Sequence, residues 1–390
     1  MGYFRSGCST ETDASKAVEQ IYDAVIQDEI SLIIFFCSQD YSLQDISKQI
    51  AEKFSGIEVV GCTSSGCIGR EGYQNKGIVA CSFAAEAFGF SVQLVPDVQE
   101  FSYHLADELV SDLKDKINSS WPEESQASHF FALQFIDGLS LREETFTQIL
   151  STALNGIPLL GGSAGDDLKF QHTYIYCGGK FHSNAGIVIL GETNLRFQPF
   201  MIQHFLPTEK RLVVTESIPE KRIVISLNGL PAAVEYARNV GCTVEELNSE
   251  VFASHPVLVK LGDQVYVRSI QQLNDDGSLT FFCAIDDGVV LSVAEAEEIV
   301  ENLEREMNKV KLRVGDLGIV IGFDCVFRYL EIEQQDQVGL VSDIFKKNAV
   351  FGFNSYGEQF SSMHVNQTFT GIAFSSEVVE DDGWSSCIVI

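Results

Sequence analysis

One histidine of the 390-residue chain has a sequence setting that suits a metal-bound cofactor. In the run from Phe200 to Leu206, the two-residue period of a β-strand places His204 on the same face as Phe200, Ile202 and Leu206. Haem needs an apolar slot and one basic nitrogen for its iron. The pattern therefore predicts His204 as the ligand of a haem b iron, with Arg211 close enough along the chain to meet the propionates. A second histidine has similar apolar neighbours, so the setting by itself does not decide.

A cysteine and a histidine nearer the C-terminal end suggest a different chemistry. Cys325, with Asp324 beside it, and His364 are the residue types of a thiolate nucleophile and its base. Nothing in the sequence brings their two segments together. Arg328 follows Asp324 at a spacing more typical of an ion pair that fixes a turn. We therefore expect a non-catalytic protein and keep a Cys-dependent enzyme that uses Cys325 and His364 as an alternative.

Three glycine-rich segments repeat one pattern, in which an apolar pair precedes a Gly/Ser-rich turn and an asparagine precedes a later strand. They begin at Gly61 (GCTSSG), Gly161 (GGSAGD) and Gly352 (GFNSYGE). Such turns expose backbone N–H groups at strand ends, where α/β sheets bind ligands. This interpretation predicts a small-metabolite site built from Ser64, Ser65, Gly66, Gly162, Ser163, Asp166, Arg328, Tyr356, Glu358, His364 and Asn366. For any one segment a tight strand corner explains the glycines as well, but three copies favour a shared fold unit.

Common nucleotide and zinc motifs are not supported. Gly66 is not followed by the Lys-Ser/Thr pair of a phosphate-binding loop, and the segment from Gly161 lacks the dinucleotide fingerprint. Cys62 and Cys67 have no second close pair of Cys or His residues, which argues against structural zinc.

The charge balance limits the partners. The chain has 26 basic and 55 acidic residues and a net charge of −29, which repels nucleic acids and anionic lipids. We expect no nucleic-acid binding and no membrane insertion, because no apolar run approaches the length of a membrane span. Ten cysteines without a recognisable signal peptide are typical of reduced thiols, so we expect a cytoplasmic protein.

Helical and strand-like periodicities alternate along the chain. Helical spacing over Ala17–Val25 and Leu43–Phe54 brackets a continuous apolar strand over Ile30–Phe36, whereas strand-like runs dominate from Thr173 to Leu230. We also expect a strand over Val326–Leu330. The predicted class is α/β with α+β character: two packed domains with mixed parallel and antiparallel sheets flanked by helices. We place these domains at residues 1–196 and 197–376, with an acidic tail over 377–390.

Several motifs, in one order, resemble the FIST family. VGCTSSG from Val60, LGGSAGD from Leu160 and LNGLPA from Leu227 resemble the FIST N domain and the start of the FIST C domain. GFDCVFR from Gly322 and HVNQTFTG from His364 resemble the FIST C domain. The resemblance runs from about residue 30 to residue 374, nearly the whole chain.

The resemblance implies a sensory protein that binds a small ligand and regulates a separate signalling enzyme. Two-domain members of this length resemble the NosP group of haem-containing nitric-oxide sensors, whose partners are histidine kinases or cyclic-di-GMP enzymes. Many relatives have a Gly-rich turn where this chain has Gln203–Pro207, which favours the haem-binding branch. We therefore expect haem-based nitric-oxide sensing through His204, with an amino-acid or small-metabolite module without haem as the alternative.

Overall fold

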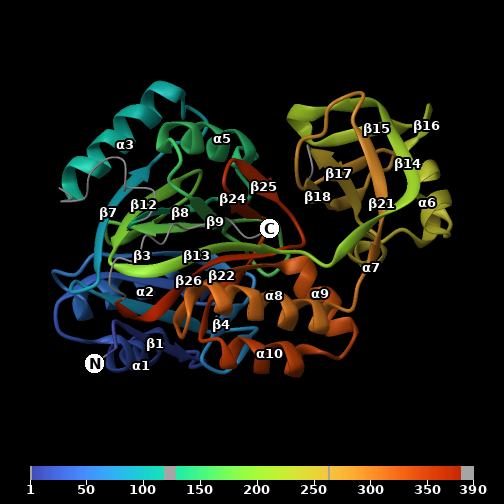
Figure 1. The fold of residues 1–390 in the computed structure, drawn as a ribbon. Helices are drawn as coiled ribbons and strands as arrows, with labels where there is room; N and C mark the ends of the chain where they lie inside the picture. The colour runs from blue at the N-terminus through green and yellow to red at the C-terminus, as the bar shows by residue number, and fades with distance from the viewer. Residues whose placement is uncertain (1, 118–128, 262–263, 379–390) are drawn as a thin grey trace.

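The computed structural model describes residues 2–117, 129–261 and 264–378. It consists of a large body and a smaller lobe beside it (Figure 1). The lobe is formed by residues 205–296, which are inserted between two elements of the body. In this part of the chain, three sheets combine parallel and antiparallel strands, the lobe's sheet is antiparallel, and helices flank the body sheets. The predicted mixed α/β class is therefore confirmed.

The body contains three copies of one unit with the order strand, helix, strand, helix region, strand, hairpin, strand. The first unit is β1 (Phe4–Ser9), α1 (Ala14–Val25), β2 (Ile30–Ser38), α2 (Leu43–Lys53), β3 (Val59–Ser64), β4 (Cys67–Gly69), β5 (Gly72–Gln74) and β6 (Ile78–Ala84). The second is β7 (Phe88–Val95), α3 (Tyr103–Ile117), β8 (Phe130–Ile136), α5 (Glu143–Leu154), β9 (Leu159–Ser163), β10 (Ile175–Cys177), β11 (Lys180–His182) and β12 (Gly186–Thr193). The third is β13 (Leu195–Ile202), α8 (Ile299–Val314), β22 (Leu317–Cys325), α9 (Val326–Gln334), α10 (Val338–Lys347), β23 (Val350–Ser355), β24 (Glu358–Phe360), β25 (Met363–Val365) and β26 (Phe369–Val378).

The three units complete one another's sheets. The strand orders β1-β6-β2-β3-β10-β11, β7-β12-β8-β9-β24-β25 and β13-β26-β22-β23-β4-β5 are the same topology. In each sheet the last two strands are a hairpin from another unit: unit two donates to unit one, unit three to unit two, and unit one to unit three. The fold unit predicted from the glycine-rich repeats is therefore confirmed, and the body has the topology of a closed three-fold exchange.

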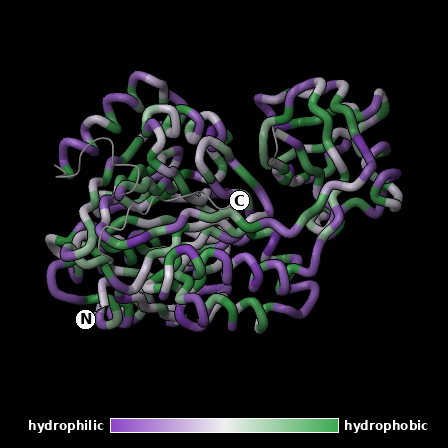
Figure 2. Tube along the Cα trace, in the orientation of Figure 1, coloured by the Kyte–Doolittle hydropathy of each residue, from purple (hydrophilic) through white to green (hydrophobic). Residues whose placement is uncertain are grey.

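Alternating residues of the central strands face two different cores. In β2, Leu32, Ile34 and Phe36 join a core shared by all three sheets, whereas the intervening residues pack under α1 and α2. This explains the continuous apolar run, because a strand buried on both faces does not alternate in polarity. Equivalent phenylalanines meet in the shared core: the ring centroids of Phe36 and Phe135 are 5.3 Å apart, and those of Phe135 and Phe323 6.0 Å. The helices outside alternate between hydrophilic and hydrophobic residues (Figure 2).

A glycine at the same place in each unit allows the parallel strands to pack closely. A Cβ atom on Gly61 or Gly161 would lie 2.1 Å from a backbone oxygen of the paired strand, and on Gly352 1.7 Å from one. These glycines open the three loops that the sequence singles out. Their function is thus first of all steric.

The lobe has its own sheet and its own core. Its elements are β14 (Phe205–Ile218), a 3₁₀ turn (Pro219–Lys221), β15 (Ile223–Leu227), β16 (Leu230–Pro231), α6 (Ala232–Val240), a second 3₁₀ turn (Val244–Glu246), α7 (Ser249–Ser254), β17 (Val257–Leu261), β18 (Gln264–Arg268), β19 (Ile270–Leu273), β20 (Leu279–Phe281) and β21 (Val290–Ala296). Its largest apolar cluster contains residues of the lobe alone.

The strand predicted over Val326–Leu330 is wrong, because this segment opens helix α9. Its apolar run resembles a buried strand, but Val326, Phe327 and Tyr329 are buried on different sides of a helix that connects β22 to the next strand region. The predicted domain boundary at 196/197 falls within β13 and stays a prediction. Of the predicted tail, residues 379–390 lie outside the described residues. None of the described helices is long and apolar enough to span a membrane.

The close approach at Gly161 generates a stability prediction. Gly161→Ala places a methyl group against the backbone oxygen of Gln134, so we expect a loss of roughly 1–3 kcal/mol or more in the free energy of unfolding. Gly339→Ala is the matched control, since this helical glycine has open space around its Cβ position and should be unchanged or slightly more stable. Urea unfolding of both variants measures the difference. Equal midpoints would contradict the steric role.

Candidate functional site

The three glycine-rich loops meet at the carboxyl ends of β3, β9 and β23. Equivalent backbone hydrogen bonds, each 3.1 Å long, join them in a ring: Ser65 N to Asn354 O, Gly165 N to Thr63 O, and Tyr356 N to Ser163 O. The three glycine-rich segments found in the sequence therefore lie together in the structure. Ligands of α/β proteins bind at this end of a sheet.

Most of the predicted loop side chains are satisfied within the protein. Asp166 accepts hydrogen bonds from the backbone N–H groups of Phe170, Gln171 and His172 and from the Tyr356 hydroxyl. The hydroxyl of Ser64 donates to a backbone carbonyl, and that of Ser65 accepts from a backbone N–H. Gly66 and Gly162 pack closely against Asn354 and Phe353. These groups shape the loops and have little capacity left for a ligand.

Two buried residues near the loops, Ser163 and Glu358, have features found in catalytic sites but lack the surrounding groups that catalysis needs. Residues 161–165 read G-x-S-x-G, the pattern of a nucleophile elbow. However, Ser163 is fully buried and accepts a hydrogen bond from Gln359, and the segment after it leads to a loop and β10 instead of a helix. Glu358 is bonded by Ser355 and Thr368, and burial raises its pKa to about 8. Both residues stabilise the interior of the loop region.

Cys325 does not have the surroundings of a reactive thiolate. It is buried, and burial raises the pKa of its thiol well above the ordinary value, with Glu358 adding to the effect. It packs with Phe282 and Phe327 in a small apolar cluster. The His364 ring instead faces Gln359, whose amide lies 3.2 Å from its Nδ1. Among the described contacts, none joins Cys325 to His364.

His204 holds the lobe to the body through a buried polar chain. Its Nδ1 lies 3.2 Å from Nη1 of Arg328 and its Nε2 lies 2.9 Å from Glu331, and both partners are on α9. Because a guanidinium can only donate, Nδ1 accepts and Nε2 carries the proton. Arg328 is fully buried and also lies 2.9 Å from Asp324, which accepts from the hydroxyl of Tyr73.

The same residue lies where the chain enters the lobe. His204 precedes β14, and its backbone oxygen accepts from the N–H of Glu297, just where the chain leaves the lobe after β21. Phe205 and Ala296 pair directly beyond this bond. The two connections between lobe and body therefore run side by side, and His204 fixes both to α9.

These surroundings do not fit a haem ligand. Both ring nitrogens of His204 are engaged, so iron could bind only after a buried hydrogen bond breaks. Phe200 and Ile202 pack into the core under α8 and α10. Leu206 is 53 % exposed, and the Arg211 side chain bonds to Ser292 on the lobe. The residues around His204 therefore do not fit haem in this arrangement, and haem binding stays a prediction.

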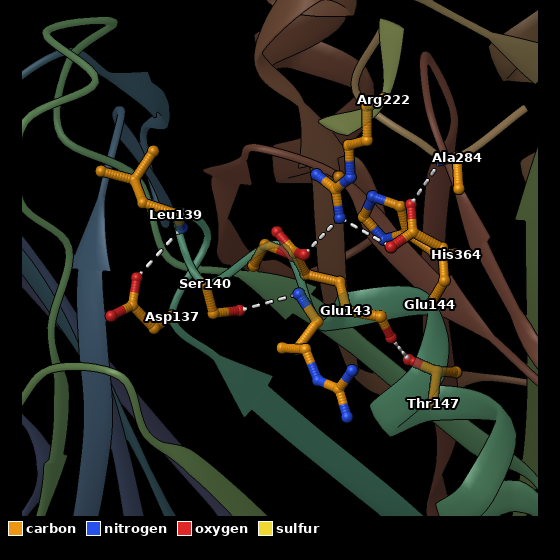
Figure 3. Close-up of polar contacts among 12 residues, drawn as sticks. Asp137, Leu139, Ser140, Glu143, Glu144, Thr147, Arg222, Ala284 and His364 are labelled. Carbon is orange, nitrogen blue, oxygen red and sulfur yellow. Dashed lines mark hydrogen bonds and ion pairs between the residues drawn. The ribbon is translucent and has the colours of Figure 1, made fainter. Parts of the chain in front are cut away.

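A second contact between lobe and body is an ion-pair cluster (Figure 3). Arg222, at the end of a 3₁₀ turn of the lobe, lies 2.5 Å from Glu143 and 2.6 Å from Glu144 in the first turn of α5. The backbone N–H of Ala284 in the lobe also donates to Glu144. Burial raises the pKa of Glu143 to about 7 against the opposing effect of Arg222. The His364 ring lies beside this cluster, and burial lowers its pKa to about 4, so it is neutral.

Next to this cluster, several buried polar groups lack partners. Among the described residues, both amide atoms of Asn366 and of Gln367 have no hydrogen-bond partner, although these side chains are 1 % and 0 % exposed. Such groups cost free energy unless something satisfies them. The strand register makes Asn75 of the first unit equivalent to Asn366, and Asn75 accepts a hydrogen bond from the Tyr329 hydroxyl. Asn366 of the third unit therefore differs from Asn75, because among the described residues its side-chain amide has no hydrogen-bond partner.

The lobe's contribution to this junction between lobe and body could not be predicted from the sequence. Arg222, Arg268 and Ala284 come from the lobe, whereas Glu143 and Glu144 lie roughly 80 to 140 residues earlier. In the sequence, the adjacent glutamates at positions 143 and 144, at the start of a helix, were the one local feature that could have indicated this junction. Of the predicted ligand residues, the structure brings His364 and Asn366 to this junction, while Asp166 and Tyr356 lie in the neighbouring loop.

The network around His204 generates the second prediction. His204→Ala removes the buried imidazole that bonds to both Arg328 and Glu331, so we expect a loss of roughly 1.5–3 kcal/mol in the free energy of unfolding. His104→Ala, at a side chain 81 % exposed, is the control and should change stability by less than about 0.5 kcal/mol. Chemical denaturation of both variants tests this. A His204→Ala variant as stable as the control would overturn the structural role of His204.

Two sequence profiles of one known family match this chain. The sequence profile of the FIST N domain matches residues 31–230 and that of the FIST C domain matches residues 232–361. No curated protein matches the chain. The boundary between the two profiles falls at β16, inside the lobe. The chain therefore belongs to the FIST family and has the FIST N and FIST C architecture of sensory and signalling proteins.

Proposed function

We propose that this protein is a non-catalytic sensory module that binds a small polar metabolite at the junction between lobe and body. The observation that carries the proposal is the pair of buried, unpartnered amides of Asn366 and Gln367 next to the contact between the two parts. Amides with free donors and acceptors are typical of sites that orient a small polar ligand.

Aromatic rings from both parts line one side of the same junction. Phe170 and Tyr356 of the body stack with ring centroids 4.9 Å apart, and Phe170 lies 6.1 Å from Phe282 of the lobe. Phe282 in turn contacts Phe327 at 5.0 Å. A ligand here would contact polar amides together with an apolar wall, the usual composition of a metabolite site.

The attachment of the lobe offers a route from ligand to signal. The lobe is attached by the two adjacent chain segments at His204 and Glu297. The ion pairs of Arg222 and a small apolar cluster around Phe282 also hold it to the body. Relative motion is the usual expectation for domains whose contact includes polar groups, as this one does. A ligand that contacts both parts would favour one arrangement over another, and a partner protein would respond to that change.

Three expectations from the sequence remain proposals. Nitric-oxide sensing through haem would require His204 to leave Arg328 or Glu331. An enzyme that uses Cys325 and His364 would require both to move. A cytosolic histidine kinase or cyclic-di-GMP enzyme as partner rests on the signalling family, since a sensor acts through another protein.

A thermal-shift screen tests ligand binding. The probes are the standard L-amino acids together with uncharged sugars and nucleosides, and a ligand at 100 times its Kd should stabilise the protein by about 2.7 kcal/mol. We expect Asn366→Ala to abolish the shift. Asn75→Ala should keep the shift while losing stability, because its amide bonds to Tyr329 and lies in another unit.

Two outcomes would contradict the proposal. The first is the absence of a shift with any probe while protein supplied with haem shows a Soret band that moves with nitric oxide. The second is an unchanged shift in Asn366→Ala. In the first case haem sensing becomes the better proposal. In the second case the protein still binds a ligand, but at a site that does not include Asn366.

A further inference from the structure

Arg268, at the end of β18 in the lobe, is a buried cation that has no counter-ion in the described part of the chain. Its side chain is 9 % exposed, and its Nη1 donates only to the backbone oxygens of Val267, at 3.1 Å, and His364, at 3.5 Å. Among the described residues no carboxylate lies within ion-pair distance of it. Arg222 nearby shows the usual solution, because it is neutralised by Glu143 and Glu144. A buried charge is usually paired, because an unpaired one costs free energy.

The groups next to Arg268 do not supply the missing negative charge. The pKa of His364 is lowered to about 4, mainly by burial and also by Arg222 and Arg268, against the opposing effect of Glu144, so the ring is neutral. Burial raises the pKa of the Cys283 thiol to about 11, so it is neutral as well. The backbone oxygens that Arg268 contacts carry only partial charge. The guanidinium therefore remains able to bind an anion.

A second recognition group lies close to His364, in the bend that follows β25. Asn366 follows His364 by two residues, and the ideal Cβ position of Gly357 is 2.3 Å from the His364 ring and 3.1 Å from Nδ2 of Asn366. The imidazole and the free amide thus lie side by side. Arg268 contacts the backbone of the same histidine from the lobe. A cation of the lobe and an unpartnered amide of the body accordingly flank one residue.

We propose that Arg268 and Asn366 bind the carboxylate of a small ligand across the junction between lobe and body. The inference rests on the proposed function and specifies its ligand class. A guanidinium presents a planar fork that matches a carboxylate with two parallel hydrogen bonds, and an amide N–H adds a further donor. One unpaired guanidinium matches a single negative charge. The net charge of −29 and the neighbouring glutamates disfavour a phosphate dianion at this place.

The experiment compares ligands that differ only in the carboxylate. Each amino acid that shifts the melting temperature is tested beside its carboxamide, and acetate and lactate are added as carboxylates without an amino group. We expect the carboxylates to bind and the matched carboxamides to bind roughly 10- to 100-fold more weakly. Arg268→Gln should weaken carboxylate binding by a similar factor, and Arg268→Lys should retain part of it. Arg211→Gln, an exposed arginine of the same lobe, should leave binding unchanged.

The ligand-free proteins give an independent readout. Because Arg268→Gln removes an uncompensated buried charge, its melting temperature should equal or exceed that of the parent protein. Arg222→Gln should lower it, since Glu143 and Glu144 lose their partner. A lowered melting temperature of Arg268→Gln would assign Arg268 a structural role and overturn the inference.

The two proposals fail in different ways. Equal binding of acids and carboxamides, lost in Asn366→Ala but kept in Arg268→Gln, overturns the carboxylate assignment and leaves the ligand site standing. Failure of every acid, carboxamide and neutral probe to shift the parent protein overturns both.

Discussion

The exchange of hairpins among three repeated units is the constraint on which the rest of the body depends. Each sheet ends with a hairpin of another unit, so no unit can complete its sheet alone. The parallel strands at the centre of each sheet approach so closely that Gly61, Gly161 and Gly352 have no room for a side chain. The backbone bonds between the three loops follow from this packing, and they bring polar residues of all three units to one end of the body.

The inserted lobe breaks the symmetry of these units and creates the one junction at which a ligand is expected. It enters between β13 and α8 of the third unit, and His204 ties its two connections to α9. The lobe then contributes Arg222, Arg268 and Phe282 to a face that the third hairpin and α5 provide from the body. Equivalent asparagines consequently differ in their hydrogen bonds: the amide of Asn75 accepts one from Tyr329, whereas the buried amide of Asn366 has no partner among the described residues.

Burial explains why two chemically suggestive sequence patterns have structural roles. The G-x-S-x-G run around Ser163 and the cysteine at position 325 both lie in the interior, where the thiol stays protonated and the serine is bonded to Gln359. His204 on its apolar strand face suits haem by residue type alone. In the folded chain its two ring nitrogens are bonded to Arg328 and Glu331, and this is decided by a helix more than 120 residues away.

The sequence by itself determined the family, the mixed α/β class and the threefold repeat, because these depend on local patterns. Apolar runs such as residues 30–36 mark strands buried on both faces, and the glycines that open each loop mark close strand contacts. Only the tertiary structure decided which polar residues are already satisfied and which remain free. Asn366 is one of many candidate ligand residues in the sequence and Arg268 is not among them, because their need for a partner arises from burial beside chain segments distant in sequence.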